Sequence, residues 1–452
     1  MNDKNKKLIA EAESGDAAAQ LNLGAMYYDG EDVEQDYAKA FEWFEKASER
    51  GAAEAQFNLG VMYHNGKGTA QDYEKAAEWY EKAAAQGVAE AQLNLGVMHH
   101  DGDGVRQSYK QAAELFKKAA EQENAEAQFN LGIMYYDGKG MTRDYKKAFE
   151  CFKEAAGRGL SDAQFNLGWM YYHGKGTAQD YEKAAEWYEK AAAQGIAEAQ
   201  LNLGIMHYDG EGTAQNYAKA TEWYEKAAAQ DIAKAQFNLG VMHHHGKGIA
   251  QDYEKAAEWY EKAAAQKNSD AWNNLGTMYY DGKGVAQDYA KAFELFEKAA
   301  EHENMTAQHN LGVMYHNGKG TAQDYEKAAG WYEKAAAQGI AEAQLNLGYM
   351  HCYGEGVAQD YAKAFELFKK AAEHENMTAQ HNLGLMYYHG KGVRQDYKKA
   401  FEWYEKAALQ GNTAARNNLG LMYERGEGTA QNLKKAAELY GKSDEHGDSV
   451  AQ

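Results

Sequence analysis

The stretch DAAAQLNLGAMYYDGEDVEQDYAKAFEWFEKASERG, residues 16–51, holds two apolar-periodic segments on either side of a glycine-bearing loop. This pattern predicts a helix, a loop and a second helix. Its NLG tripeptide recurs every 36 residues, with the glycine at Gly24, Gly60, Gly96, Gly132, Gly168, Gly204, Gly240, Gly276, Gly312, Gly348, Gly384 and Gly420. A period of this length is typical of a solenoid. The sequence therefore predicts an all-α fold, an α-solenoid of about twelve 36-residue helix-loop-helix repeats.

The repeats fill most of the chain without an insertion or deletion. Repeats 1 to 12 start at residues 16, 52, 88, 124, 160, 196, 232, 268, 304, 340, 376 and 412, and the last ends at 447. Residues 1–15 predict an N-terminal capping helix, and residues 448–452 a truncated start of a further repeat or a tail. One helix pair cannot bury its apolar face alone, so stability comes from stacking on its neighbours. We expect one elongated array.

Several positions predict the helices and their packing. Asp36 is a good N-cap for the second helix, and every repeat has Asp, Asn or Ser there. Glu42 and Lys46 are spaced to pair on a solvated outer face. On the first helix Leu23 and Met26 belong to the core stripe, and Gly24 lets a neighbouring helix approach closely.

The ends of the second helices also follow a pattern. Seven repeats finish in Gly, where a left-handed residue is wanted, as at Gly51. Four others have an Asn next in sequence, which we interpret as the substitute for that conformation: Asn124, Asn268, Asn304 and Asn376. Asp231-Ile232 has no evident substitute.

Composition excludes some classes of partner and site. Lys and Arg total 48 against 68 Asp and Glu, a net charge of −20, so we expect no nucleic acid partner. The two cysteines, Cys151 and Cys352, are too few for a disulfide framework. No apolar run approaches a membrane helix and no signal peptide is evident, so we expect no membrane insertion and a cytoplasmic location. A secreted or periplasmic location stays open. We expect a monomer.

The combination AxAQxNLGxMY, GxG and QDYxKAxxWYEKAAAQG resembles the Sel-1-like repeat, a relative of the tetratricopeptide repeat. The resemblance covers residues 16–447 and implies a right-handed superhelix of antiparallel helix pairs that acts mostly as a protein-binding adaptor, in many cases in bacteria. The chain lacks the proline that the family often places before QD; Ala70 and Ala178 stand there. It also lacks the cysteine pairs of the secreted members linked to penicillin binding or hydrolysis, so that activity is not carried over.

Motifs of catalysis are missing. No serine lies in a GxSxG or SxxK arrangement, there is no HExxH, and the NGKG loops lack the spacing of a phosphate loop. His243, His244 and His245 are consecutive on a helix end and would point in different directions, which disfavours a metal site. We expect no enzyme activity, no metal and no cofactor.

The candidate binding surface is a second apolar stripe on each first helix, at the places of Leu21, Ala25 and Tyr28. We call it the first-helix stripe. A helix that is apolar on both sides is sandwiched or faces a binding groove. The stripe varies between repeats, which suggests tailoring to a ligand, although packing of adjacent repeats explains it equally well. The anchors that we predict are Phe57, Phe129, Phe165, Trp169, Phe237 and Tyr349.

Beside this stripe, Asn22 and its equivalents form a ladder of carboxamides. Such groups can bond the backbone of an extended peptide, and they can equally bond an adjacent helix or loop. The members that we predict as peptide contacts are Asn58, Asn130, Asn166, Asn202 and Asn238. The function expected is a non-catalytic interaction scaffold or adaptor that binds a protein or peptide in the concave groove of the first helices. The alternative is a secreted or periplasmic repeat protein with a hydrolase or host-interaction role.

Overall fold

A computed structural model describes residues 3–444 and the side chains of residues 5–441. Within these residues the structure has 25 α-helices and no strand, as the repeat predicts. Helix α1 (Asp3–Glu13) comes first, and twelve helix pairs follow it. The predicted tail at residues 448–452 lies outside the described residues.

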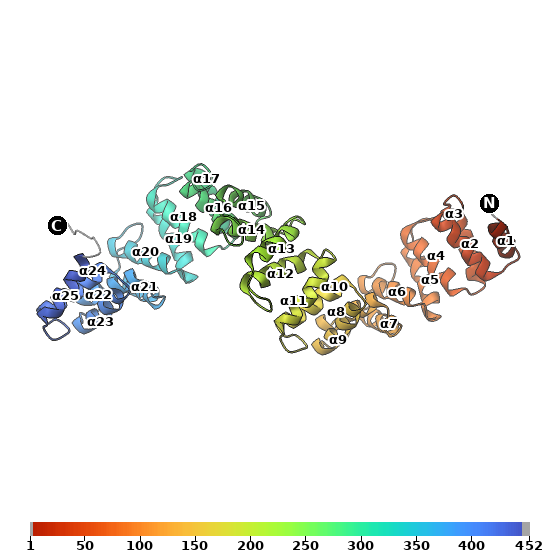
Figure 1. The fold of residues 1–452 in the computed structure, drawn as a ribbon, viewed down its shortest axis with the longest axis horizontal. Coiled ribbons are helices and arrows are strands. Elements are labelled where there is room, and N and C mark those ends of the chain that lie inside the picture. The colour runs from red at the N-terminus through yellow and green to blue at the C-terminus, as the bar shows by residue number, and fades with distance from the viewer. Residues whose placement is uncertain (1–2, 445–452) are drawn as a thin grey trace. The chain divides into compact units, whose positions relative to one another are not determined.

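Each repeat contributes one helix pair (Figure 1). The first helices are α2 (Ala17–Asp29), α4 (Ala53–Asn65), α6 (Ala89–Asp101), α8 (Ala125–Asp137), α10 (Ser161–His173), α12 (Ala197–Asp209), α14 (Ala233–His245), α16 (Ser269–Asp281), α18 (Met305–Asn317), α20 (Ala341–Tyr353), α22 (Met377–His389) and α24 (Thr413–Arg425). The second helices are α3 (Tyr37–Glu49), α5 (Tyr73–Ala85), α7 (Tyr109–Glu121), α9 (Tyr145–Gly157), α11 (Tyr181–Ala193), α13 (Tyr217–Ala228), α15 (Tyr253–Ala265), α17 (Tyr289–Glu301), α19 (Tyr325–Ala337), α21 (Tyr361–Glu373), α23 (Tyr397–Leu409) and α25 (Leu433–Asp444).

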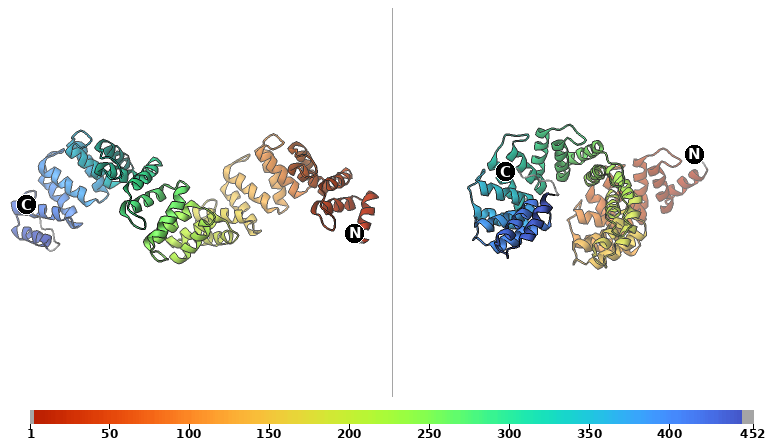
Figure 2. Two further views of the ribbon diagram at one scale, coloured as in Figure 1. Left: turned by 90° about the horizontal axis from the view of Figure 1, so that it is seen from above. Right: turned by 60° about the vertical axis from the view of Figure 1, so that its left-hand side comes forward.

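The helix pairs form two compact units, residues 1–230 and residues 231–452. Within each unit, every second helix packs against the first helix of its own repeat and, where a further repeat of the unit follows, against the first helix of that repeat. The views in Figure 2 show this side-by-side order of consecutive pairs inside each unit. Stability inside a unit is therefore a sum of contacts between neighbours.

The core stripes lie where the helical period predicts them. In repeat 2, Leu59 and Met62 of α4 are fully buried, and Tyr80 of α5 is 2% exposed. Gly60 lies against the ring of Tyr80, because a Cβ built on Gly60 would come within 2.6 Å of Tyr80 Cδ1. The predicted close approach at this glycine is confirmed, and it recurs at Gly24, whose Cβ would lie 2.7 Å from the Phe44 ring.

The predicted N-caps are confirmed, and the expected role of the substitute asparagines is wrong. The side chain of Asp36 accepts a hydrogen bond from the Lys39 backbone N–H at 3.0 Å. Gly51 takes the left-handed conformation, with φ of 84°. Where that glycine is missing, the non-glycine residue itself takes it: Glu123, Asp231, Lys267, Glu303 and Glu375 have φ between 58° and 67°.

Those asparagines instead cap the next first helix. Asn124 has φ of −69°, and its side chain accepts from the Ala127 N–H at 2.9 Å. The same N-cap contact forms at Asn268, Asn304 and Asn376. The sequence analysis assigned each asparagine to the end of the second helix instead of the start of the next first helix. The C-terminal position of one helix and the N-cap of the next are adjacent, and both tolerate Asn.

The outer face also differs from expectation. Among the described residues Glu42 and Lys46 form no ion pair, because Lys46 Nζ lies 4.0 Å from the centroid of the Trp43 ring. The i,i+4 pair does form between Glu294 and Lys298 at 2.6 Å, in a repeat that has Leu295 at the place of the tryptophan. Among the described residues, repeats 3 and 10 also have leucine there, Leu115 and Leu367, and form no such pair, so the absence of tryptophan permits the ion pair without ensuring it.

Candidate functional site

All eleven predicted site residues lie on first helices, and all are half-buried. Eight of them belong to the unit of residues 1–230, on α4, α8, α10 and α12. The other three belong to the unit of residues 231–452, namely Phe237, Asn238 and Tyr349. Their binding role stays a prediction.

The four phenylalanines of the first-helix stripe each rest on an aromatic ring of the second helix in the same repeat. Phe57 and Tyr80 have ring centroids 5.8 Å apart, and Phe237 and Tyr260 are also 5.8 Å apart. Phe129 lies 5.7 Å from Phe152 in the same way, and Phe165 lies 5.7 Å from Tyr188. One part of each ring therefore stabilises its own repeat, while the half-exposed remainder faces outward.

In the unit of residues 1–230, the first-helix stripes of repeats 4 and 5 contact each other. The ring of Trp169 on α10 lies 5.8 Å from Tyr136 on α8, in edge-to-face geometry. Phe129 and Trp169 pack against one core cluster, and Phe165 and Trp169 against the next. The structure thus brings three of the predicted anchors together across repeats 4 and 5. Packing between repeats is a real part of the role of Trp169.

The asparagine ladder divides into bonded and unbonded members. The hydroxyl of Tyr188 is hydrogen-bonded by the Asn202 side chain of the next repeat. Tyr80 is bonded by Asn94 in the same way, although burial still raises the pKa of Tyr80 to about 12. In each of these amides one hydrogen-bonding group is used between adjacent repeats.

The unbonded members follow a second helix that has phenylalanine at the place of that tyrosine. Asn58, Asn130 and Asn166 follow Phe44, Phe116 and Phe152, which carry no hydroxyl. Within the described residues the side chains of these three asparagines make no hydrogen bond. Their amide groups are half-exposed beside the first-helix stripe, so their donors are available to a ligand.

Sequence reasoning missed this division. Part of the signal was present in the alternation of Phe and Tyr at one buried place of the second helix, 14 residues before each ladder asparagine. Asn310 and Asn382 also follow a phenylalanine, but they bond Asn273 and Tyr349 of the preceding repeat instead. Both rings satisfy the apolar pattern equally, so periodicity alone gave no reason to separate them. The hydroxyl matters only once the next repeat is stacked on it.

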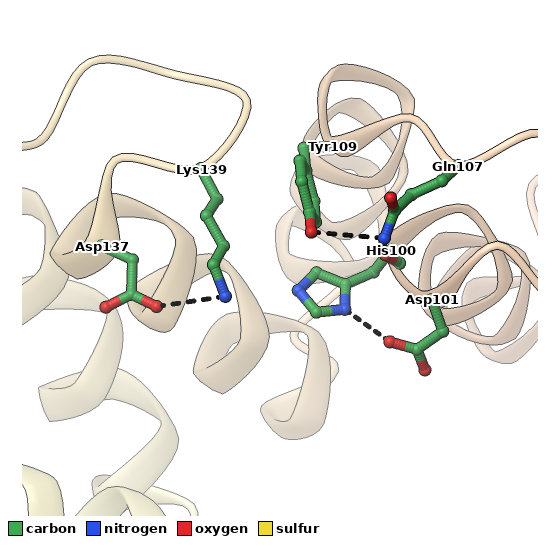
Figure 3. A network of polar contacts seen from close by, with 6 residues as sticks. All are labelled: His100, Asp101, Gln107, Tyr109, Asp137 and Lys139. Atoms are coloured by element: carbon green, nitrogen blue, oxygen red, sulfur yellow. Dashed lines mark hydrogen bonds and ion pairs between the residues drawn. The ribbon is translucent and has the colours of Figure 1, made fainter.

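At the outer end of the first helix, in ten of the twelve repeats, a ring of that helix packs on the tyrosine that opens the second helix. Figure 3 shows this place in repeat 3, where the His100 and Tyr109 rings are 5.2 Å apart. His100 Nδ1 lies 2.6 Å from Asp101 Oδ1, and Gln107 Nε2 donates to the Tyr109 hydroxyl at 3.2 Å. Lys139 of the next repeat extends toward this ring pair (Figure 3).

Two cavities open on the first-helix face of the unit of residues 231–452. One has a volume of about 290 Å³ and lies around Thr277, His309 and Asn310. The other has a volume of about 280 Å³ and lies around Tyr349, Cys352 and Tyr353. Burial lowers the pKa of His309, which takes the place of a stripe phenylalanine and lies 5.8 Å from Tyr332.

Within residues 3–444 no group of three or more His, Cys, Asp or Glu side chains could hold a metal ion. His243 is buried, His244 half-buried and His245 exposed, so the three rings have different environments. None of the helices described is both long and apolar enough to cross a membrane.

Comparison with known proteins follows the repeat along the chain. The Sel1 repeat model matches twelve segments: 17–51, 53–88, 89–124, 125–160, 161–196, 197–232, 233–268, 269–304, 306–340, 341–376, 378–412 and 413–448. No curated protein sequence matches the chain.

Two solved structures resemble the chain over much of its length. One is a protective antigen present in uropathogenic Escherichia coli strains that displays an SLR fold; it is 38% identical, covers 97% of this chain and 94% of its own, and has a TM-score of 0.89. The other is a Sel1 repeat protein from Oxalobacter formigenes; it is 33% identical, covers 70% of this chain and 91% of its own, and has a TM-score of 0.52.

Proposed function

The chain belongs to the Sel1 repeat family, and from this membership we propose a non-catalytic scaffold that binds a protein or an extended peptide along its first helices. Sel1 repeat proteins are generally scaffolds for protein interactions. The finer part of the proposal is the place of binding. It is the first-helix face of the unit of residues 1–230, with Phe57, Phe129, Phe165 and Trp169 as anchors.

The three unbonded amides of Asn58, Asn130 and Asn166 carry this proposal. A half-buried amide without an internal partner loses hydrogen bonds to water in the folded chain, and an extended peptide backbone can restore them. The half-exposed rings beside them supply apolar contact area of the kind that anchors a peptide. Asn202 is bonded to Tyr188, so we assign it to the scaffold and not to the ligand.

The test compares two sets of alanine variants. Asn58→Ala, Asn130→Ala and Asn166→Ala combined should lower affinity for a partner captured with the intact chain by about tenfold or more, because three donors are lost. Their thermal midpoint should stay unchanged, since none has an internal bond. The control is Asn94→Ala with Asn202→Ala, which should lower the thermal midpoint because two hydrogen bonds between repeats are broken. Unchanged affinity of the triple variant would place the binding surface elsewhere.

These variants are preferable to serine substitutions of the stripe. Phe129, Phe165 and Trp169 contact core clusters, so their removal would lower affinity and stability together. A stripe variant that binds the partner normally would nevertheless contradict the proposal.

A second candidate concerns location and role. We keep a cytoplasmic scaffold as the first of two candidates. The similarity to a protective antigen of uropathogenic Escherichia coli supports a host-interaction role outside the cytoplasm. Fractionation of the source cell separates the two candidates, because a cytoplasmic scaffold is recovered with the soluble cell contents and a host-interacting protein with the envelope or the medium.

A further inference from the structure

A pair of aromatic rings recurs at the outer end of the repeats. The first-helix ring at the place of Tyr28 packs edge-to-face on the tyrosine that opens the second helix, with ring centroids 5.0 to 5.2 Å apart in repeats 1 to 9 and in repeat 11. The first ring is Tyr or His in all ten. The chain thus fills this place with its own ring.

A lysine of the next repeat completes the arrangement in several copies. Lys67 Nζ donates to the Tyr28 hydroxyl at 3.2 Å and lies 5.1 Å from the Tyr37 ring centroid. Lys319 donates to the Tyr280 hydroxyl at 2.9 Å and lies 4.9 Å from the centroid of Tyr289. The complete arrangement is therefore two rings and one ammonium group, and the hydroxyl of the first-helix tyrosine accepts the hydrogen bond from the ammonium.

Repeat 10 lacks the first-helix ring of this arrangement. Cys352 stands at its place, and the cavity of about 280 Å³ opens there, between Cys352, Tyr361 and Lys391. Lys391 Nζ lies 5.4 Å from the Tyr361 centroid, which is close to the position of Lys67 and Lys319 over their rings. Among the described residues, Lys391 Nζ donates no hydrogen bond. The second ring and the lysine are in place, and the first ring is absent.

The mouth of the cavity is aromatic. Tyr353, which is 70% exposed, stands where the other repeats have Asp, Asn, His or Arg. Its ring is nearly parallel to that of Tyr349, at 16° and 6.3 Å. The Tyr349 hydroxyl accepts a hydrogen bond from Asn382 Nδ2 at 2.7 Å, which fixes this wall of the cavity. A large exposed ring beside an aromatic cavity indicates a binding site.

We propose that this cavity binds a tyrosine side chain of a protein partner. The incoming ring takes the place of the missing one against the edge or face of Tyr361, and its hydroxyl accepts a hydrogen bond from Lys391 Nζ. Tyrosine stands at six of the ten equivalent places, and the lysine bonds to Tyr28 and Tyr280 specify this occupant. A phenylalanine would fill the cavity but leave the ammonium without its acceptor. The inference goes beyond the proposed function, because it names a further binding place, in the unit of residues 231–452, and the chemistry of its occupant.

The first experiment uses the two cysteines as reporter and control. N-acetyl-tyrosinamide is titrated into the intact chain, and alkylation of Cys352 and Cys151 by iodoacetamide is followed by mass spectrometry. We expect the compound to slow the reaction of Cys352 at least fivefold at saturation and to leave Cys151, on α9, unchanged. N-acetyl-phenylalaninamide should require a several-fold higher concentration. Equal protection by both compounds, or none, overturns the proposal.

Two variants test the parts of the site. Lys391→Met should abolish the preference for the tyrosine compound over the phenylalanine compound. Cys352→Tyr supplies the missing ring, so it should raise the thermal midpoint and remove the binding seen by ligand-observed NMR. Persistent binding in Cys352→Tyr contradicts the assigned place. Cys352→Ala leaves the cavity open and should bind as the unmodified chain does.

These results are separable from the test of the proposed function. The probe is a small compound and the variants lie in repeats 10 and 11, whereas the unbonded asparagines lie in repeats 2, 4 and 5. If the cavity binds no tyrosine compound, the proposed binding surface in repeats 2, 4 and 5 is not affected. If the triple asparagine variant binds its partner normally, the proposed tyrosine site is not affected.

Discussion

At the scale of single residues, a pair of glutamines joins the two helices of most repeats. The glutamine at the end of the second helix donates from Nε2 to Oε1 of the buried glutamine on the first helix, at 2.8 to 3.0 Å in seven repeats. Repeat 10 breaks the pair: His374 stands at the donor place, and Gln344 Oε1 is buried without a hydrogen bond. An unsatisfied buried acceptor costs free energy.

His374→Gln should therefore stabilise the protein. The new amide can donate to Gln344 Oε1, and we expect the free energy of unfolding to rise by about 1 kcal/mol in denaturant titrations. The opposite change, Gln410→His, removes the bond to Gln380 and should lower it by about 1 to 3 kcal/mol. If both variants unfold like the parent chain, the glutamine pair contributes nothing to stability.

Two histidines predict a dependence of stability on pH. Burial lowers the pKa of His309 and of His381 below the ordinary 6.5. As the pH falls below 6.5, the unfolded chain takes up protons at these rings before the folded chain does, so stability is complete above 6.5 and declines below it. His309→Phe with His381→Phe should flatten the fall of the thermal midpoint between neutral and acidic pH. Phe237→His should make the thermal midpoint fall more steeply with pH. If neither variant changes this slope, other groups control the pH dependence of stability.

At the scale of the helix, the glycine of NLG sets how closely the two helices of a repeat approach. A Cβ on Gly312 of α18 would lie 2.6 Å from the Tyr332 ring of α19. The same repeat holds a second helical glycine, Gly330 on α19, where an added Cβ would meet no atom within 4 Å apart from those of its chain neighbours and its own helix backbone. One repeat therefore contains a glycine with a packing role and one without.

Gly312→Ala should destabilise the chain by about 1 to 3 kcal/mol, since the ring has to shift. Gly330→Ala should stabilise it by about 0.5 to 1 kcal/mol, because alanine favours a helix over glycine. Chemical denaturation of the two variants beside the parent chain measures both signs. Stabilisation by Gly312→Ala would show that the helices can separate without cost.

Most of the fold follows from the sequence, because the repeat carries a strict period, a cap and a stripe that all agree. Asp36, Gly51 and Gly24 act as their positions predict. Features that depend on a neighbouring repeat did not follow, such as the hydroxyl of Tyr188 that bonds Asn202. The same holds for the cavity beside Cys352, because periodicity predicts which face of a helix is buried and does not predict where a cavity forms.

At the scale of the whole molecule, contacts join each repeat mainly to its neighbours, within two compact units. Such an array unfolds locally, and a destabilised repeat lowers protection mostly around itself. In Gly312→Ala we expect amide hydrogen exchange to accelerate most in α16 to α21 and least in residues 1–230. Peptide-resolved exchange with mass spectrometry measures this. Equal acceleration along the whole chain would indicate a single cooperative body.

The most direct test of the scaffold account is photo-crosslinking in the source cell. A benzoyl-phenylalanine replaces Asn130 or Asn166 on the first helices, and in matched controls replaces the exposed Glu150 or Glu186 on the second helices of the same two repeats. The account predicts that one protein is crosslinked from both asparagine positions and from neither glutamate position. Crosslinks to that protein from Glu150 and Glu186 alone would contradict it and place the binding surface on the outer face.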